Sequence, residues 1–185
     1  MIDYGLLQKS IDFYEKRGFS RVEAPWTITQ QVDDITRPPD RQPFVLKHND
    51  KSLVASGEQS FLYLYLKGFI PKGCFQTITP CYRYESFDFL HSKYFMKNEL
   101  ICTDTVSESR LLSIAEIALE FYREMIPDAE IVKTIQGFDI EIDGKELGSY
   151  GIRSCEFLDW IYATGCAEPR TSSLRKLYGV PSKKH

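Results

Sequence analysis

The feature that most constrains the fold is a pair of long strand-like runs, Cys74 to Glu85 and Tyr94 to Thr103. Only the polar and aromatic segment from Ser86 to Lys93 separates them. A link this short joins antiparallel neighbours, because two parallel strands need a crossover of about a dozen residues or more. The sequence therefore predicts an antiparallel pair connected by a loop in the middle of the chain.

A second group of strands follows in the C-terminal half of the chain. Strand-like segments run from Ile131 to Gln136 and from Phe138 to Ile142. The dipeptide Asp143-Gly144 is typical of a tight turn before the segment from Lys145 to Ser154. Short turns again join these strands, so we expect the sheet to be mostly antiparallel.

Helical patterns lie before, between and after these strands. Apolar residues recur at helical spacing from Tyr4 to Arg17, with Gly18 as the stop, and Gly57 to Leu66 favours a buried helix. Thr105-Val106-Ser107-Glu108 fits a capping box before an amphipathic helix of about five turns. Thr171 to Tyr178 predicts a short last helix.

Together these patterns predict an α+β fold, a mostly antiparallel sheet flanked by helices. A chain of 185 residues, 43% of them hydrophobic, can bury one sizeable core, so we expect one domain spanning residues 1–185. The formal charge of −3 leaves no global basic field to hold a phosphate backbone. Nucleic-acid binding would have to be local or borrowed from a partner.

The remaining N-terminal segments have weaker patterns. Phe19 to Ala24 indicates a short strand that ends at a proline, and Thr27 to Pro43 indicates a long loop near a ligand or a partner. Phe44 to Lys47 and Ser52 to Ala55 predict a hairpin.

Cysteine usage and hydropathy bound the compartment and the metal chemistry. The five cysteines are odd in number and contain no C-x-x-C pair, so we expect neither a disulfide framework nor a zinc knuckle. No apolar run approaches the roughly 18 to 20 residues that cross a bilayer, and the polar start lacks a signal peptide. The expectation is a cytoplasmic protein without a membrane segment.

The residues best suited to chemistry lie on the two central strands. Arg83 and Glu85 are two apart, so their side chains project from one sheet face. On the returning strand Phe95, Lys97 and Glu99 also share one face. An arginine fork suits a phosphate oxygen, and a neighbouring carboxylate accepts from the exocyclic amine of a base. The alternative is a cross-strand ladder of salt bridges on a solvated face.

A wider pattern contains these residues. Tyr82-Arg83-Tyr84-Glu85, a loop of about eight residues, and Tyr94-Phe95-Met96-Lys97-Asn98-Glu99 follow one another. The segment resembles motif 2 of the class II aminoacyl-tRNA synthetases, Phe-Arg-x-Glu followed by a loop and a returning strand with an aromatic residue. Tyr82 replaces the usual phenylalanine.

The resemblance to motif 2 implies a role for each matching residue. Arg83 would contact the α-phosphate and the substrate carboxylate, and Glu85 would read the adenine amine. Phe95 would stack on adenine, while His91 and Lys93 are the loop groups able to reach the phosphates.

Two further segments resemble the other motifs of this family in the expected order. The first predicted helix and then Glu23-Ala24-Pro25-Trp26 resemble motif 1, which implies a dimer seam around Pro25 and Trp26. Ala163-Thr164-Gly165-Cys166-Ala167-Glu168-Pro169-Arg170 resembles motif 3, with alanines in place of two glycines. This motif implies that Arg170 reaches the γ-phosphate of ATP.

The resemblance also implies a metal site and a substrate site. Glu146, with Ser149 three positions later, matches the strand that binds magnesium and the α-phosphate, and oxygen ligands suit that cation. A glutamate after a turn on an exposed strand is the alternative. Glu58 corresponds to the loop that holds the substrate amino group, although its segment could equally start a helix. Lys97 and Glu99 are expected to face the substrate as well.

The function implied is activation of an amino acid or related small carboxylate as its adenylate, with ATP and Mg²⁺. The alternative is a paralogue that keeps the fold as a binding or regulatory subunit. We expect a homodimer joined at the motif 1 seam. No anticodon-binding segment or basic arm is recognised, so tRNA is expected to bind only weakly or through a partner.

Overall fold

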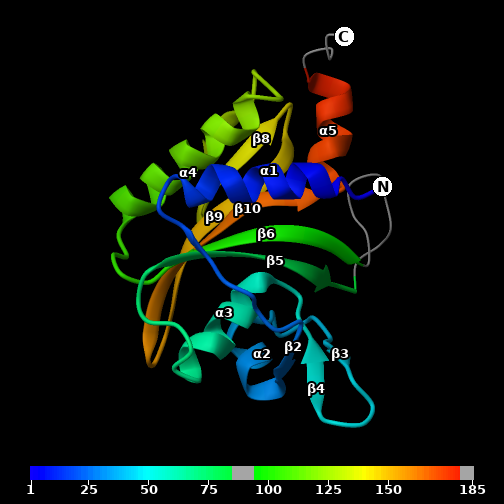
Figure 1. Cartoon of the computed structure of the whole chain (residues 1–185), viewed down its shortest axis with the longest axis vertical. Coiled ribbons are helices and arrows are strands. Elements are labelled where there is room, and N and C mark those ends of the chain that lie inside the picture. The colour runs from blue at the N-terminus through cyan, green and yellow to red at the C-terminus, as the bar shows by residue number, and fades with distance from the viewer. Residues whose placement is uncertain (85–93, 180–185) are drawn as a thin grey trace.

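The computed structural model describes residues 1–84 and 94–179, which form a seven-stranded sheet with helices on both faces (Figure 1). All neighbouring strands pair antiparallel except β1 and β5, which pair in parallel. The expected α+β architecture with a mostly antiparallel sheet is confirmed. In spatial order the strands are β1 (Ser20–Arg21), β5 (Cys74–Tyr82), β6 (Tyr94–Cys102), β10 (Leu158–Glu168), β9 (Lys145–Cys155), β8 (Gly137–Ile142) and β7 (Glu130–Lys133).

Two amphipathic helices, α1 (Tyr4–Glu15) and α4 (Glu108–Arg123), cover one face of this sheet (Figure 1). The start of α4 differs from the predicted capping box, which made Thr105 the cap. In the structure the Ser107 hydroxyl is the N-cap and accepts from the Arg110 N–H at 3.2 Å. Both hydroxyl residues favour the N-cap position, so the sequence pattern did not separate them.

The opposite face carries the rest of the N-terminal half (Figure 1). Helix α3 (Gly57–Leu66) packs on β5 and β6, with the bounds that its sequence pattern predicted. The predicted hairpin is also present, because β3 (Phe44–Val45) pairs with β4 (Lys51–Leu53). β4 also pairs with β2 (Thr27–Thr29), and α2 (Gln30–Thr36) follows directly.

The prediction of a long loop from Thr27 to Pro43 is therefore wrong in its first half. Val32 of α2 is buried and Ile35 is partly buried against the core that contains Phe61 of α3. A helix of two turns with two apolar anchors has too little periodicity to be recognised in a polar segment, and its packing partners lie far along the chain.

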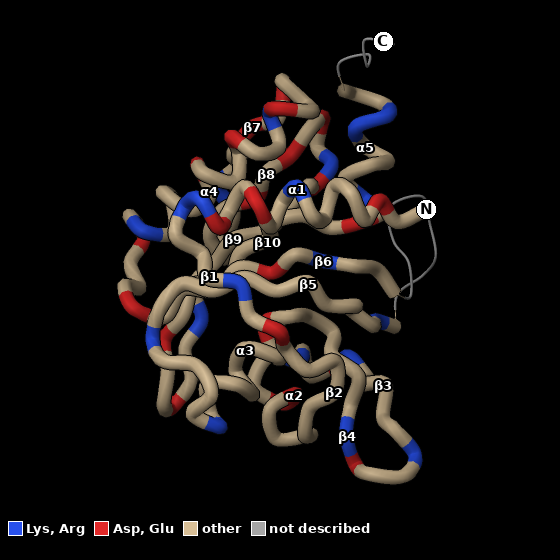
Figure 2. The backbone as a smooth tube through the Cα atoms, in the orientation of Figure 1, with Lys and Arg blue, Asp and Glu red and all other residues tan. Residues whose placement is uncertain are grey.

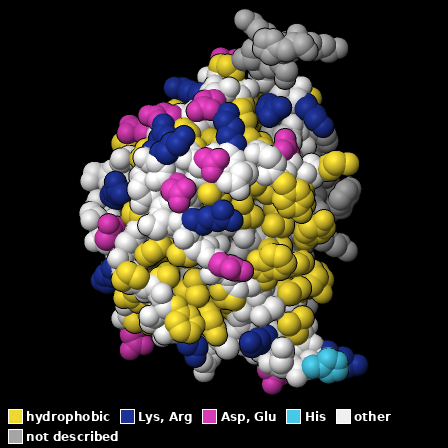
Figure 3. Space-filling view, viewed as in Figure 1, with side chains coloured by type: hydrophobic (Ala, Val, Ile, Leu, Met, Phe, Trp, Pro, Cys, Tyr) yellow, Lys and Arg dark blue, Asp and Glu magenta, His cyan; other side chains and the backbone are white. Residues whose placement is uncertain are grey.

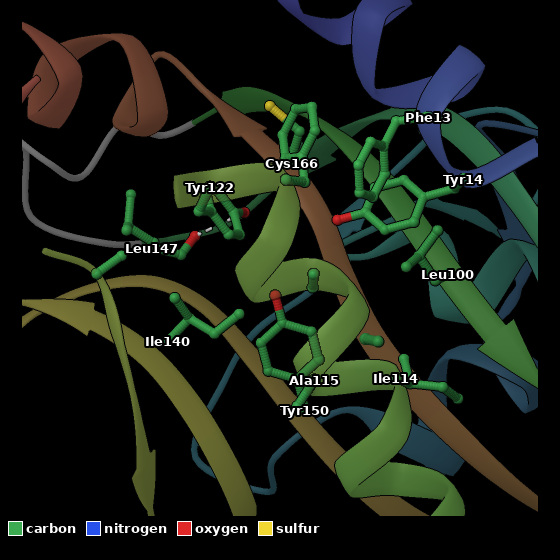
Figure 4. Close-up of a cluster of buried hydrophobic side chains, with 14 of the residues drawn as sticks. Phe13, Tyr14, Leu100, Ile114, Ala115, Tyr122, Ile140, Leu147, Tyr150 and Cys166 are labelled. Carbon is green, nitrogen blue, oxygen red and sulfur yellow. Dashed lines mark hydrogen bonds between the residues drawn. The ribbon is translucent and has the colours of Figure 1, made fainter. Parts of the chain in front are cut away.

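Alternate side chains of the central strands enter two separate cores. On β6, Leu100 belongs to the larger core under α1 and α4, whereas its neighbour Ile101 belongs to the smaller core beside α3. Figure 4 shows the larger core, in which Tyr14, Tyr122 and Tyr150 converge from α1, α4 and β9. The period of two along each strand thus assigns one face to each core.

Each of the two long strands β9 and β10 carries a bulge, an extra residue that has no partner in the neighbouring strand. In β9 the register against β8 shifts next to Glu146, and Leu147 is the extra residue. In β10 the register against β6 shifts after Thr164, and Gly165 is the extra residue. Because a bulge interrupts the alternation, two residues three positions apart across it can face the same side.

The cysteines differ from the expectation. Cys74 and Cys102 lie directly opposite each other on β5 and β6 and form a disulfide, with their Cα atoms 4.1 Å apart. The expectation was wrong for this pair because the two residues are 28 positions apart, and only the strand register brings them together. The other cysteines, Cys81, Cys155 and Cys166, do not form disulfides.

The backbone positions of charged residues of both signs are interspersed along the helices and strands (Figure 2). The backbone view shows Lys and Arg close to Asp and Glu in most parts of the described chain. No helix in the described ranges is both long and apolar enough to cross a membrane.

Candidate active site

A cavity of about 430 Å³ lies on the α3 side of the sheet, between the central strands and α2. It brings together every predicted ligand-binding residue that the structure describes. Glu85, His91 and Lys93 were also predicted and lie outside the described residues. The predicted residues that line the cavity are Glu58, Arg83, Phe95, Lys97, Glu99, Glu146, Ser149 and Arg170.

The cavity is richer in cations than the chain as a whole, whose formal charge is −3. Among the described residues that line it, the basic side chains outnumber the acidic ones. A positive cavity in an acidic chain attracts anionic ligands in preference to other parts of the surface. The basic residues are Arg37, Arg41, Arg83, Lys97, Arg153 and Arg170, and the acidic ones are Asp33, Glu58, Glu99 and Glu146.

Arg83 follows the end of β5 and reaches over Phe95 near the start of β6. Its Nε donates to the Ala55 carbonyl at 3.0 Å, which ties the side chain to the loop before α3. The guanidinium carbon lies 5.1 Å from the centroid of the Phe95 ring, within the range of a cation–π contact. A flat aromatic ring and a fork of donors therefore face the same cavity.

The β9 bulge explains how Glu146 and Ser149 both reach the cavity. Residues three apart on a regular strand point to opposite faces, but the extra residue Leu147 restores both to one side. Arg170, the first residue of α5 (Arg170–Tyr178), donates from Nη1 to Glu146 Oε1 at 2.6 Å. Glu146, the predicted metal ligand, and Arg170, the predicted γ-phosphate ligand, therefore form an ion pair with each other.

The oxygen atoms around Glu146 fit a hard divalent cation. Asp139 of β8 lies directly opposite Ser149 in the sheet and carries a second carboxylate near this group, which the sequence pattern did not indicate, although Asp139 does not line the cavity. Burial is the main cause that raises the pKa of Asp139, and Glu146 adds to it, while Ser149 and Arg170 act in the opposite direction. Carboxylate and hydroxyl oxygens are the ligands that Mg²⁺ prefers.

Glu58 lies at the inner wall of the cavity and is almost fully buried. Its two oxygens accept from Trp160 Nε1 and from Arg153 Nη1, both at 2.6 Å. Burial raises the pKa of the Glu58 carboxyl, and Arg153 opposes that rise. The Arg153 guanidinium carbon lies 4.5 Å from the centroid of the Tyr162 ring, within the range of a cation–π contact.

A second ion pair adjoins the first, and both of its side chains are buried. Lys97 Nζ donates to Glu99 Oε1 at 2.9 Å, and the Ser56 hydroxyl donates to Glu99 Oε2 at 2.6 Å. The same hydroxyl caps α3 by accepting from the Glu58 N–H at 3.3 Å. A side chain at Gly57 would place its Cβ 2.8 Å from the Glu99 Cβ, so α3 and β6 can meet this closely only at glycine.

No protein-family model and no curated protein sequence matches this chain. Solved structures do match. The pyrrolysyl-tRNA synthetase of Desulfitobacterium hafniense superposes with a TM-score of 0.71 at 21% identity, over 95% of this chain and 70% of that one. A second structure, the Desulfitobacterium hafniense PylSc, gives a TM-score of 0.74 at 20% identity, over 97% and 71%.

Seryl enzymes give similar values. The cytoplasmic serine-tRNA ligase of Naegleria fowleri, solved in complex with AMP, has a TM-score of 0.68 at 15% identity over 91% of this chain and 52% of its own. The Pyrococcus horikoshii seryl-tRNA synthetase, complexed with ATP, has 0.66 at 14%, over 94% and 49%. This chain has the class II aminoacyl-tRNA synthetase catalytic fold.

Within this class II fold, several cavity residues were missed from the sequence. Arg153 of β9 and Tyr162 of β10 line the cavity, and Arg153 meets Glu58 of α3, which is 95 positions away in the sequence. Asp33 of α2 is also buried there, held by Gln59 Nε2 and Arg37 Nε, both at 2.7 Å. Arg153 could have been found from its spacing, because it lies four positions after Ser149 on the same strand and therefore faces the same side of the sheet.

The predicted seam residues of the class II fold lie outside the cavity. Trp26 is 54% exposed. Pro25 is half-buried, and its carbonyl accepts from the Ser60 hydroxyl at 2.7 Å. These contacts anchor the segment to α3 and leave the indole accessible.

Proposed function

We propose that this protein uses ATP and Mg²⁺ to activate an amino acid or a related small carboxylate as its adenylate. The observation that carries the proposal is the convergence of Arg83, Phe95, Glu146 and Arg170 in one cavity. The fold supports it, since the Pyrococcus horikoshii seryl enzyme was solved with ATP and the Naegleria fowleri one with AMP.

The proposed reaction needs no side chain to act as a base, because the substrate carboxylate is already ionised. One of its oxygens forms a bond to the α-phosphorus, and the bond from that phosphorus to the bridging oxygen of the β-phosphate breaks. Pyrophosphate leaves with the bonding electrons. Arg83 neutralises the charge that develops at the α-phosphate, and Phe95 supports the adenine ring.

Arg170 supplies the remaining direct contact to the triphosphate, and Glu146 would act on it through Mg²⁺. Arg170 would exchange Glu146 for the γ-phosphate when ATP enters, and Glu146 and Ser149 would then hold Mg²⁺. When bound, Mg²⁺ would supply charge neutralisation on the phosphate oxygens. Glu85 and His91, outside the described residues, are assigned the adenine amine and the phosphates.

The inner wall favours a polar substrate. The oxygens of Glu58 and Glu99 already accept from protein donors, whereas Arg153 has only Glu58 as an acceptor among the described side chains. Arg153 therefore retains donors for an oxygen on the substrate, with Lys97 nearby in the same wall. Glu58 and Glu99 act by holding these two cations in place and by attracting the substrate amino group.

The decisive experiment is the exchange of labelled pyrophosphate into ATP, run with each common amino acid in turn and without tRNA. The proposal expects exchange with at least one polar amino acid. ATP binding without exchange for any carboxylate would favour the alternative of a regulatory subunit. Exchange that requires added tRNA would contradict the proposal that tRNA binds only weakly or through a partner.

We also propose a cytoplasmic, single-domain homodimer. Apolar side chains gather on the lower part of the face shown in Figure 3, beneath a more highly charged upper part. Exposed aromatic residues such as Trp26 and Phe69 add apolar surface that a second copy could cover. Light scattering should give twice the mass of 21.4 kDa at micromolar concentration, and Trp26→Ser should shift the protein towards the monomer.

A further inference from the structure

Three buried tyrosines approach the sheet from the core side and end at the backbone carbonyls of the two bulges. Each hydroxyl donates to a carbonyl of the extra residue or of the residue directly before it. Figure 4 shows the bond from the Tyr122 hydroxyl to the Leu147 carbonyl as a dashed line. The bonds are Tyr122 to the Leu147 carbonyl at 3.2 Å, Tyr14 to the Gly165 carbonyl at 3.0 Å and Tyr150 to the Thr164 carbonyl at 2.8 Å.

These hydroxyls meet a need that the bulges create. An extra residue interrupts the hydrogen-bond ladder, and a buried carbonyl without a partner is unfavourable. Tyr14, Tyr122 and Tyr150 are fully buried, and burial raises the pKa of each phenol well above its ordinary value. Each hydroxyl therefore stays protonated and remains a donor over the working pH range.

The β10 bulge is also shaped to the ring of Tyr14. A Cβ at Gly165 would lie 3.0 Å from Tyr14 Cε2 and 3.1 Å from Asn98 Nδ2. Such distances are too short for ordinary packing in a close-packed interior. The Tyr14 ring of α1 therefore packs closely against the bulge of β10, and its hydroxyl also donates a hydrogen bond to that bulge.

The other side of each bulge is the wall of the cavity. Glu146 and Ser149 flank the Leu147 bulge, and Thr164 and Ala167 flank the Gly165 bulge. All four residues line the cavity. Their shared direction depends on the bulges, because a regular strand would turn residues three apart to opposite faces.

We propose that Tyr14, Tyr122 and Tyr150 are positioning residues for the ATP site. They hold the bulge carbonyls from behind the sheet and so keep Glu146 and its neighbours aimed into the cavity. The reference to ATP rests on the proposed function, whereas the effect on the bulges does not.

The test compares Tyr122→Phe and Tyr14→Phe with Ile114→Val. The tyrosine variants keep the ring and remove only the donor, while Ile114→Val removes a methylene from the same core, on α4. Two quantities are measured for each protein, amide hydrogen exchange in peptides covering residues 145–149 and 164–168, and the affinity for ATP with MgCl₂ by calorimetry. Thermal unfolding shows how much stability each variant loses.

Faster exchange is expected at 145–149 in Tyr122→Phe and at 164–168 in Tyr14→Phe. ATP affinity should fall about three- to tenfold in both, as expected for the loss of one buried hydrogen bond. Ile114→Val should change neither the amide exchange of these two peptides nor the ATP affinity, even if it lowers the melting temperature as much as the tyrosine variants do.

Unchanged exchange at both bulges would overturn the inference. Unchanged ATP affinity in variants whose bulges had loosened would overturn it too. If the wild-type protein bound no ATP, the proposed function would fail instead, and the exchange measurements would still decide whether the tyrosines hold the bulges.

Discussion

The two faces of the central strands differ although they are built from adjacent residues. On β6, Leu100 is fully buried in a mainly apolar core, while Glu99, its neighbour, accepts from Lys97 and Ser56 at the wall of the cavity. Alternation along a strand allows one face to stabilise the fold and the other to carry charge. Changes to apolar side chains of the core face, away from the tyrosines that contact the bulges, should therefore act on stability, and changes on the cavity face should act on ligands.

The largest expected effect is on the core face. Leu100→Ala should lower the free energy of unfolding by about 2 to 5 kcal/mol, because it leaves a cavity in a packed core. The protein that remains folded should bind ATP with unchanged affinity. Denaturant unfolding and calorimetry measure the two quantities, and loss of ATP affinity without loss of stability would break the comparison between the faces.

Arg83→Ala should have the opposite profile. Removal of a charge-assisted phosphate contact should lower pyrophosphate exchange about 10²-fold or more, with little change in the melting temperature. Arg21→Ala removes an exposed arginine from β1 outside the cavity and serves as the control. Equal ATP binding by the Arg83 variant and the control would reject the proposed site.

Glu146→Gln tests the metal side of the cavity. The pair with Arg170 is partly exposed, so stability should change by less than about 1 kcal/mol. ATP should bind with a smaller gain from MgCl₂ than in the wild type, because one carboxylate ligand is lost. Calorimetry with and without MgCl₂ measures this gain. Glu108→Gln, on the exposed start of α4, should leave it unchanged.

The smallest expected effect is a pH dependence at the inner wall. The pKa of Glu58 is raised in the folded state from an ordinary value of 4.5, so the folded protein binds this proton more tightly than the unfolded chain. The contribution of the group to stability is therefore present at low pH and is lost as pH rises through the folded pKa. Thermal unfolding of the wild type and Glu58→Gln from pH 4 to pH 7 should show the wild type losing stability relative to the variant. A difference that does not depend on pH would contradict this.

Features with local signals were predictable from the sequence. The β5–β6 pair and α3 have the periodicity and stop residues that define them, and Arg83 and Phe95 lie in a motif of adjacent residues. Positions two apart on paired strands then had to share a face. The cavity face of β6 follows from this alternation alone.

Features that depend on distant register were not predictable. Arg153 of β9 meets Glu58 of α3, which is 95 positions away in the sequence. The contact exists because α3 packs on β6 and β9 lies two strands from β6 in the sheet. The Cys74–Cys102 bond likewise depends on the pairing of β5 with β6, and α2 is stabilised by α3 rather than by its own sequence. The bulges belong to the same class, since a Glu-x-x-Ser spacing does not reveal the extra residue between them.

The bulges also determine which kinds of mutation this chain can tolerate. A substitution at Leu147 changes one side chain, but its deletion would remove the extra residue and restore regular pairing from that point. Every later position of β9 would keep its face and its partner in β8, so that Tyr150 would still point to the core and Ser149 and Arg153 to the cavity. The loss of this one codon would therefore preserve the alternation of the strand, whereas the loss of a regularly paired residue farther along β9 would turn the neighbouring side chains to the opposite face.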